Sequence, residues 1–416
     1  MTLDPRRDIA VVRDEIAGLP ALILDQAATS WEEVQTLLDD LDADRSAAAG
    51  LQAIPRVVLT GCGDSLFAGM AARWAFERYA GLPAEAIEAL DLARYYVDTL
   101  PRGTLVLPVS YSGQVARTVE AARNAAHFGA TVVAVTGRPE RRLGQTAARM
   151  LPVRVPSLGY SLGTSTYAGL LLALYLLALG LGQRRGVLTG AQVDALLDSL
   201  RAAGAATETA IAATTGPIHN YVAGLTGVEA ALFLGGGPNY ASALFGAAKL
   251  FEGAQMDGQA QNIEEWAHAQ YFISGPNGSG RTIVLAPRGR ALDRAREIAT
   301  ELRFIDAPFA VITDDDPAAW RELTPDVFAL SAAQQGGRKG LSAAQQGGRR
   351  GLSASRVPEV FSPLLFTAPL SLLGYELAVA RGKQSYNFAS PAHEEEHYHT
   401  LHESAFRDLD REDLIP

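Results

Sequence analysis

The sequence has very little cysteine and no basic stripe. Cys62 is the only cysteine among 416 residues, so the chain forms neither an internal disulfide nor a CxxC metal site. A single thiol fits a reducing cytoplasm, and we expect that location. The formal net charge is −10, which argues against a nucleic-acid partner.

Targeting and membrane-spanning segments are not expected either. The first 18 residues contain no apolar stretch that would act as a signal peptide. The longest apolar helical run, 167–182, has about 16 residues, whereas a membrane span needs roughly 20. We interpret this run as a core helix, with a membrane span as the alternative. Hydrophobic residues make up 48% of the chain, enough for a substantial core in two domains.

The order of apolar segments predicts the fold class. Residues 1–50 are predicted to be helical, with Pro20 and a capping box from Ser30 to Glu33 delimiting separate helices. Strands and helices then alternate, and near-continuous apolar strands indicate a parallel sheet covered on both faces. The predicted strands are 56–61, 84–90, 104–110, 130–137 and 149–156, and the predicted helices are 65–80, 115–129 and one beginning near 165.

The strand pattern restarts in the second half of the chain, at 230–237, 281–287 and 307–314. We therefore predict an α/β protein with two doubly wound parallel-sheet domains in tandem. The predicted parts are a helical segment at 1–50, domains at 51–182 and 221–356, and a closing helix (362–382) and tail within 357–416.

A tandem repeat interrupts the second domain. LSAAQQGGRKG (330–340) is followed by LSAAQQGGRRG (341–351), and the two units differ only at Lys339 and Arg350. An 11-residue period can indicate a helical supercoil, but the paired glycines oppose a helix. We interpret the repeat as a recent duplication in a flexible basic loop.

Two glycine-containing turns follow predicted strands, at the edge where ligands bind in parallel sheets. Glycine lets a ligand approach the backbone, and the next helix offers free N–H groups to an anion. Neither turn has the GxGxxG pattern of a dinucleotide site. The candidate binding residues are Gly63, Asp64 and Ser65 in the first turn, and Ser110, Tyr111, Ser112, Gly113 and Gln114 in the second.

Four residues that follow the predicted strand and glycine turn at 230–240 suggest catalysis. Lys249 and Glu252 are three apart, as are Glu265 and His268, so each pair shares a face if helical. A carboxylate, an ammonium and an imidazole together suit proton transfer beside a sugar carbonyl. An ordinary solvated amphipathic helix is the alternative.

These motifs resemble the sugar isomerase (SIS) domain family, and the duplicated arrangement resembles the isomerase half of the glutamine–fructose-6-phosphate aminotransferases. The resemblance covers about residues 8–392. It rests on Arg13-Asp14-Glu15-Ile16 with Pro20, GCGDS (61–65), VSYSG (109–113), Gly163-Thr164-Ser165-Thr166, KLFE (249–252), EEWAH (264–268) and FTAPLSLLGYELA (366–378).

The resemblance implies roles for the candidate residues. Glu252 would move a proton between C1 and C2 of an open-chain sugar, and Lys249 would hold and polarise the substrate. His268 would assist ring opening, reaching a neighbouring subunit's site in a homodimer. The residues expected to line the sugar and its anionic end are Ser65, Ser110, Ser112, Ser165 and Thr166, with Glu265 also expected to bind substrate.

The sequence departs from the family pattern at the binding turns. Asp64 replaces a threonine, Tyr111 a glutamine and Val115 a threonine, so polar contacts to a phosphate are lost and Asp64 would repel an anion. Arg117 is the expected substitute charge, unless the substrate carries no phosphate there. Ser390 stands where the family has a lysine, so any imine at that lysine is lost.

The tail, HEEEHYHTLHESAF (393–406), holds four of the seven histidines. Its HExxH pattern is typical of zinc sites, but a solvated helix or a histidine reaching the active site of a dimer is an alternative. We expect Cys62 to be a small packed residue.

We expect an enzyme that needs no cofactor and no metal, with a sugar or sugar phosphate as ligand. The expected reaction is isomerisation with amine release, as in deaminases or deglycases, because no glutaminase segment is recognised in the sequence. The alternatives are a plain aldose–ketose isomerase on an unphosphorylated sugar and a non-catalytic sugar-phosphate sensor.

Overall fold

The computed structural model of the chain describes residues 7–44, 50–156, 158–225, 227–276, 278, 280–331 and 357–410. The predicted repeat loop at 330–351 lies outside these residues from 332 onward.

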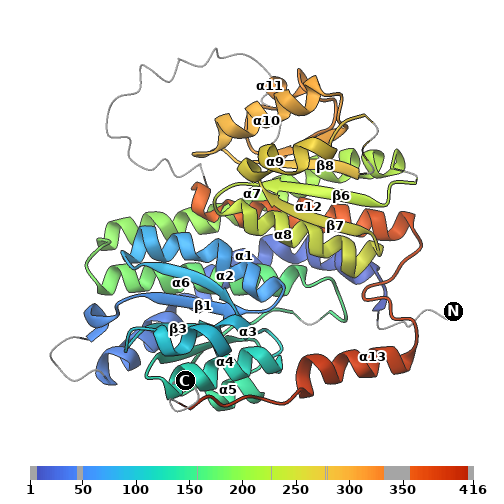
Figure 1. Cartoon of the computed structure of the whole chain (residues 1–416). Coiled ribbons are helices and arrows are strands. Elements are labelled where there is room, and N and C mark those ends of the chain that lie inside the picture. The colour runs from blue at the N-terminus through green and yellow to red at the C-terminus, as the bar shows by residue number, and fades with distance from the viewer. Residues whose placement is uncertain are drawn as a thin grey trace.

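Two parallel five-stranded sheets organise the molecule (Figure 1), which confirms the predicted α/β class. The strand orders are β2-β1-β3-β4-β5 and β7-β6-β8-β9-β10, so the second sheet repeats the order of the first. The first sheet contains β1 (Val57–Gly61), β2 (Ala84–Glu88), β3 (Leu105–Pro108), β4 (Thr131–Thr136) and β5 (Arg149–Pro152). The second contains β6 (Ala230–Gly235), β7 (Asp257–Asn262), β8 (Gly280–Ala286), β9 (Phe309–Thr313) and β10 (Val327–Ala329).

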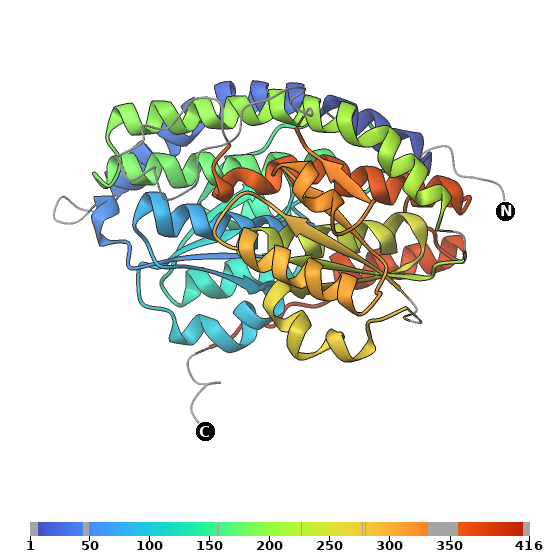
Figure 2. The same cartoon turned by 90° about the horizontal axis from the view of Figure 1, so that it is seen from above.

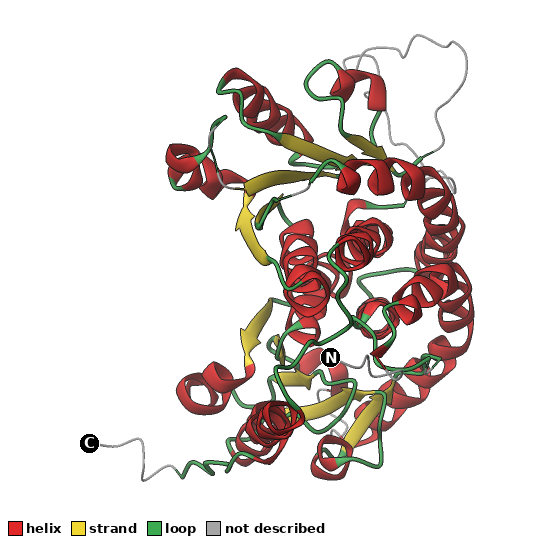
Figure 3. Ribbon diagram, turned by 90° about the vertical axis from the view of Figure 1, so that its right-hand side faces the viewer, coloured by secondary structure: helices red, strands yellow, loops and turns green. Residues whose placement is uncertain are grey.

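Helices fill the space between the sheets and cover their outer faces (Figure 3). One central core unites both sheets with α1 (Ala10–Asp44), α2 (Asp64–Ala75), α6 (Thr164–Arg184), α7 (Gly190–Ala223), α8 (Asn239–Lys249) and α12 (Ser362–Ala380). The outer faces carry α3 (Ala89–Asp91), α4 (Ala116–His127) and α5 (Arg142–Thr146) on the first sheet, and α9 (Ile263–His268), α10 (Leu292–Phe304) and α11 (Pro317–Arg321) on the second. Figure 2 shows α1 in blue and α7 in green running along one side of the molecule.

Short helical turns and the tail complete the chain. These elements are η2 (Gly50–Ala53), η3 (Phe76–Ala80), η4 (Leu92–Tyr96), η5 (Val97–Thr99), η6 (Leu250–Ala254), η7 (Gln270–Ile273), η9 (Glu359–Phe361), α13 (Pro391–Tyr398) and η10 (His399–Glu403).

Both faces of the first sheet are apolar, because successive residues of its strands are buried on opposite sides. In β1, Val57 and Leu59 face the central core, whereas Val58 packs on the α4 side. Successive side chains of a strand point to opposite faces, so an unbroken apolar run is what a sheet buried on both sides requires.

Three local predictions were wrong or incomplete. The helices expected on either side of Pro20 and Ser30 are a single helix, α1, and Ser30 lies buried within it. A proline inside a helix loses one hydrogen bond and clashes with the preceding turn, at a cost of about 3 kcal/mol, and the packing of α1 against the central core outweighs that cost. Strands β7 and β10 were not predicted, because β7 reads DGQAQN at a sheet edge and β10 has only three residues.

Two helical segments are long and apolar enough to cross a membrane by composition alone, Thr164–Arg184 and Glu359–Ala380. Their most apolar windows are 94% and 78% buried within the fold. Such burial on all sides is typical of a core helix, as predicted for 167–182.

Close packing between α12 and the end of α8 yields a stability prediction. A Cβ atom added to Gly374 would lie 2.8 Å from Cβ of Lys249, so Gly374→Ala should lower the free energy of unfolding by about 1–3 kcal/mol through overpacking. Gly18→Ala is the matched control, because that helical position has open space around it and should gain about 0.5–1 kcal/mol. Equal effects of the two substitutions in denaturant melts would contradict this packing.

Candidate active site

The chain between β6 and β7 places the first two catalytic candidates. Helix α8 ends at Lys249, and the π-helical turn η6 follows with Glu252 on it. The side chains meet as an ion pair, with 2.7 Å between Lys249 Nζ and Glu252 Oε2. Isolated π-helical turns are rare and frequent at functional sites. The predicted pairing of these residues through their three-residue spacing is therefore present.

A third charged group joins them from the first sheet. Asp64 is the first residue of α2, directly after β1 and Gly63, whose φ of 54° favours glycine. Asp64 Oδ2 lies 2.7 Å from Lys249 Nζ. A Cβ atom on Gly163 would approach the same oxygen to 2.7 Å, so glycine there leaves room for the carboxylate.

Lys249 is enclosed completely. Its side chain has no exposed surface, and its ammonium donates to Asp64, to Glu252 and to the backbone carbonyl of Leu162. The ring of Phe245 lies 4.5 Å from Nζ. An ammonium has three N–H donors, so all three are engaged.

The three charges shift one another's ionisation. Burial raises the pKa of Glu252 from about 4.5 to about 7, although Lys249 lowers it and Asp64 raises it further. Burial likewise raises the pKa of Asp64, against the opposing effect of Lys249. Burial disfavours the Lys249 charge, but the two carboxylates outweigh this and raise the pKa of its ammonium. Glu252 therefore has the pKa of a general base that works near neutral pH.

Glu15 is a buried acid that the motif analysis did not single out as a site residue. It lies on α1, and its Oε2 accepts a hydrogen bond of 3.4 Å from the backbone N–H of Ser165. Burial raises the pKa of Glu15, while Ser161, Ser165 and Lys249 lower it. The sequence contained a sign that Glu15 is buried. It lies on the same helical face as Val12, Ile16 and Leu19, which form the apolar stripe of α1.

The second turn, after β3, forms a compact cup beside this cluster. Ser110 Oγ accepts from Gly113 N at 3.2 Å, and Ser112 Oγ accepts from Gln114 N at 3.4 Å. The ring of Tyr111 packs on Gly137, where a side chain would collide with it. The predicted hydroxyl-bearing turn is present, but an aromatic ring fills part of it.

The remaining predicted hydroxyls lie at two helix starts. Ser65 follows Asp64 in the first turn of α2, and Ser165 and Thr166 lie in the first turn of α6. Thr166 Oγ1 donates to the carbonyl of Gly163 at 3.0 Å. These helix starts share the neighbourhood of Asp64, because Gly163 touches its carboxylate.

Arg117 has partners that the sequence did not suggest. Its guanidinium pairs with Glu120 and donates to Ser404 Oγ at 2.9 Å and to the carbonyl of Ala405 at 2.6 Å. Phe406 and Leu409 continue this contact by packing on the α4 side of the first sheet. Arg117 therefore anchors the tail, and the structure gives no support to its predicted role as a phosphate ligand.

The segment before α13 also reaches the charged cluster. Tyr386 N donates to the backbone carbonyl of Glu252 at 2.8 Å. Burial, followed by Glu252, Asp64 and Glu15, raises the pKa of the Tyr386 phenol. Arg7 donates to the carbonyl of Tyr386 at 2.5 Å and pairs with Glu394. The tail thus passes directly beside the candidate base.

Glu265 and His268 lie apart from the cluster within one chain. Both are on α9, which follows the edge strand β7, and both are exposed. His268 Nε2 lies 3.4 Å from Glu264, and among the described residues no contact joins it to Lys249 or Glu252. A role for His268 in this site therefore requires a second subunit.

The histidines of the tail do not assemble a metal site within the described residues. His393 and His397 pack against the ring of Phe388, with centroid distances of 5.5 and 5.3 Å. Nδ1 of His393 accepts a hydrogen bond from the backbone N–H of Ala389 at 3.2 Å. Glu394 is paired with Arg7.

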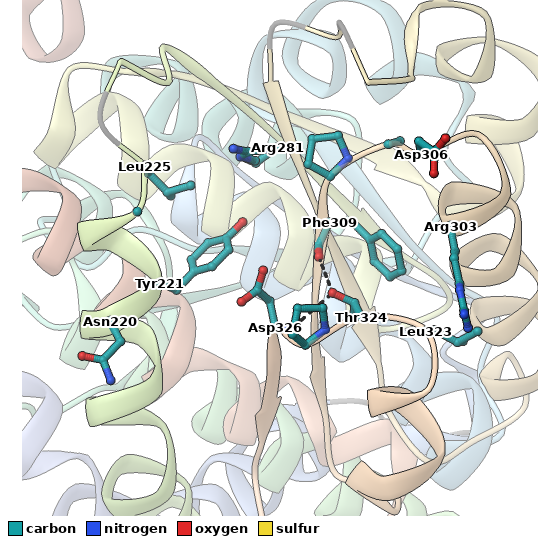
Figure 4. A pocket seen from close by; sticks show the side chains of 14 residues that line it. Asn220, Tyr221, Leu225, Arg281, Arg303, Asp306, Phe309, Leu323, Thr324 and Asp326 are labelled. Carbon is teal, nitrogen blue, oxygen red and sulfur yellow. Dashed lines mark hydrogen bonds between the residues drawn. The ribbon is translucent and has the colours of Figure 1, made fainter.

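A separate cavity of about 450 Å³ lies at the amino-terminal edge of the second sheet (Figure 4). Arg281, Asp326 and Tyr221 line it. The charged cluster instead lies where Asp64 follows β1, at the carboxyl-terminal edge of the first sheet, and this is the edge at which ligands bind in parallel sheets. We therefore take the Lys249 cluster, and not this cavity, as the candidate active site.

The environment of Cys62 predicts an unreactive thiol. Burial and the neighbouring Glu88, 3.4 Å from Sγ, raise its pKa to about 12, and the thiolate is the reactive form. Iodoacetamide at pH 7.5 should therefore alkylate the native protein far more slowly than the urea-unfolded protein, as followed by mass spectrometry. Equal rates in the two states would contradict the enclosed thiol.

Comparisons with known proteins agree with this fold. The SIS domain family model matches residues 51–180. An isomerizing glutamine–fructose-6-phosphate aminotransferase of Zymomonas mobilis is 28% identical over 351 residues, covering 84% of this chain and 52% of that protein. The chain thus spans about half the length of the curated relatives it matches.

Solved structures share the fold. The C-terminal domain of glucosamine-fructose-6-phosphate aminotransferase from Francisella tularensis aligns with a TM-score of 0.73 at 20% identity, covering 91% of this chain and 98% of that one. Glucosamine-6-phosphate deaminase from Thermotoga maritima aligns with a TM-score of 0.56 at 17% identity, covering 87% and 96%. The predicted resemblance is confirmed for residues 51–180, which match the SIS domain family model.

Proposed function

We propose that this chain is an enzyme that moves a proton between C1 and C2 of an open-chain sugar, sugar phosphate or amino sugar phosphate. The observation that carries this proposal is the pairing of Glu252 with the enclosed Lys249, 2.7 Å away, in a setting that raises the pKa of Glu252 to about 7. A non-catalytic binding protein has no need of a carboxylate poised in this way.

Glu252 acts as the base in this mechanism. It removes the proton from C2 beside the C1 aldehyde, which gives an enediol, and it returns the proton to C1 to give the ketose. Lys249 keeps Glu252 in place, since its three donors are already engaged. The hydroxyl of Ser65 is the proposed donor to a sugar oxygen, whereas Thr166 Oγ1 already donates to the carbonyl of Gly163.

Release of an amine follows from the same proton transfer. If C2 carries an amine, moving the proton of the C2–H bond to C1 leaves an imine at C2. Water then hydrolyses that imine to a ketone and ammonia. The names of the relatives support amino-sugar chemistry: they describe an aminotransferase and a glucosamine-6-phosphate deaminase. Ser390 stands where the family has a lysine, and serine cannot form an imine with the sugar. This favours release of the amine over its incorporation into the sugar through such an imine.

His268 is proposed to open the sugar ring from a partner subunit, because within one chain it is exposed and separate from Glu252. A homodimer would supply it. The homodimer, the cytoplasmic location and the independence of glutamine and of metals remain predictions from the sequence.

A sugar-phosphate sensor is the second candidate function. The tail supports it, because Tyr386 contacts Glu252, and Ser404 and Ala405 bind Arg117. A bound sugar could thereby be sensed by the end of the chain. A sensor would bind sugars saturably without exchanging their protons.

The test is deuterium wash-in at C1 and C2, followed by NMR in D2O with ammonia release measured in parallel. The panel contains glucosamine-6-phosphate, fructose-6-phosphate and fructosamine-6-phosphates with their unphosphorylated counterparts. Glu252→Gln should reduce exchange by about 10²–10⁴-fold, the usual contribution of a general base, while binding persists. Glu297→Gln, at an exposed residue of α10, is the control and should exchange normally. Saturable binding without exchange by the wild type would favour the sensor.

A further inference from the structure

The accessible side of the active site presents carboxylates and not the ammonium. The Lys249 side chain is 0% exposed, whereas those of Asp64 and Glu252 are 18% and 26% exposed. Both acids contact the same ammonium from opposite halves of the chain. A substrate entering the site therefore meets hydrogen-bond acceptors before it can approach the cation.

Asp64 has accepting capacity that the fold does not use. Its Oδ2 accepts from Lys249, but its buried Oδ1 has no hydrogen-bond partner among the described residues. A buried polar atom without a partner costs stability, so such an atom beside a candidate base calls for an explanation. Bound substrate supplies one, provided that it carries a donor.

The charge of the cluster determines which hydrogen-bond donor of a substrate can bind beside Asp64. Glu15, Asp64 and Glu252 are three acids around one buried cation, Lys249. The nearby guanidinium of Arg7 pairs with Glu394, and that of Arg117 with Glu120. A phosphate placed against Asp64 would meet like charge in a poorly solvated site, whereas a protonated amine would be attracted there.

We propose that Asp64 determines specificity by binding a protonated amine of the substrate, carried by the carbon whose C–H bond Glu252 breaks. This inference rests on the proposed function and names its substrate class: an open-chain sugar with an amino group at C1 or C2. The two carboxylates lie 2.7 Å from the same ammonium, so they are close enough for Asp64 to bind the amine while Glu252 reaches the hydrogen on the same carbon. A phosphate, where present, lies away from Asp64.

The experiment uses substrate pairs that differ only in the amine: glucosamine-6-phosphate against glucose-6-phosphate, and glucosamine against glucose. Dissociation constants from calorimetry and deuterium exchange rates are measured on the full-length protein. The wild type should prefer the amine-bearing member of each pair by about tenfold or more, the value of a hydrogen bond to a charged group. Asp64→Asn and Asp64→Thr should bring that ratio toward one, whereas Asp293→Asn, at an exposed first-turn acid of α10, should leave it unchanged.

The outcomes separate this inference from the proposed function. Exchange without any preference for the amine, or a preference that survives Asp64→Asn in a variant that melts like the wild type, overturns the role of Asp64 alone. An amine preference in binding that Asp64→Asn abolishes supports Asp64 even where no sugar exchanges, and in that case it is the proposed proton transfer that fails. Tighter binding of the amine-free phosphates would likewise contradict the inference.

Discussion

The interaction on which the structure depends is the ammonium of Lys249 held between Asp64 and Glu252. One carboxylate comes from the start of α2 in the first half of the chain and the other from the π-helical turn after α8 in the second. A buried charge is tolerated only when it is well paired, so this cluster ties the two halves together. Gly163 and Gly374 provide the space for it, since each closely approaches one of its members.

The cluster also shows how a duplicated fold produces a single site. In the first half, α2 ends at Ala75 and is followed by the π-helical turn Phe76–Ala80, just as α8 ends at Lys249 and is followed by Leu250–Ala254. Ala75 therefore takes the place of Lys249, and Arg78 that of Glu252. The first half instead contributes the strand-end turns, so that in the proposed mechanism the base and the binding turns come from different copies of the same unit.

Much of this arrangement could be predicted from local sequence. Eight of the ten strands described in the structure were predicted, most of them from apolar runs followed by turns. The three-residue spacing of Lys249 and Glu252 likewise predicted their contact. What could not be predicted was the contact between Asp64 and Lys249, which lie 185 residues apart. The partners of Arg117 could not be predicted for the same reason, since Ser404 lies 287 residues away in the sequence and approaches Arg117 only in the folded chain. The edge strand β7 was not predicted, because its sequence, DGQAQN, is polar and lacks the apolar pattern by which the other strands were identified.

These pairings change the meaning of the family resemblance at two positions. Lys249 was expected to polarise the substrate, but its donors are all engaged within the protein, which favours a positioning role. Asp64 was expected only to weaken phosphate binding, because it replaces a threonine and would repel an anion. Its position beside Glu252 instead favours an amine-bearing ligand. The fold is thus shared with the relatives, whereas the proposed ligand preference rests on departures from the family pattern.

The most direct test of the account is the titration of the Glu252 carboxyl group by 13C NMR in selectively labelled protein, with Glu252→Gln to assign the signal. The account predicts a midpoint near pH 7, because burial and Asp64 outweigh the influence of Lys249. The base would then be ionised above this pH and would lose its activity as the pH falls through it. A midpoint near the ordinary value of 4.5 would show that Glu252 is solvated, and it would contradict the enclosed cluster on which the mechanism depends.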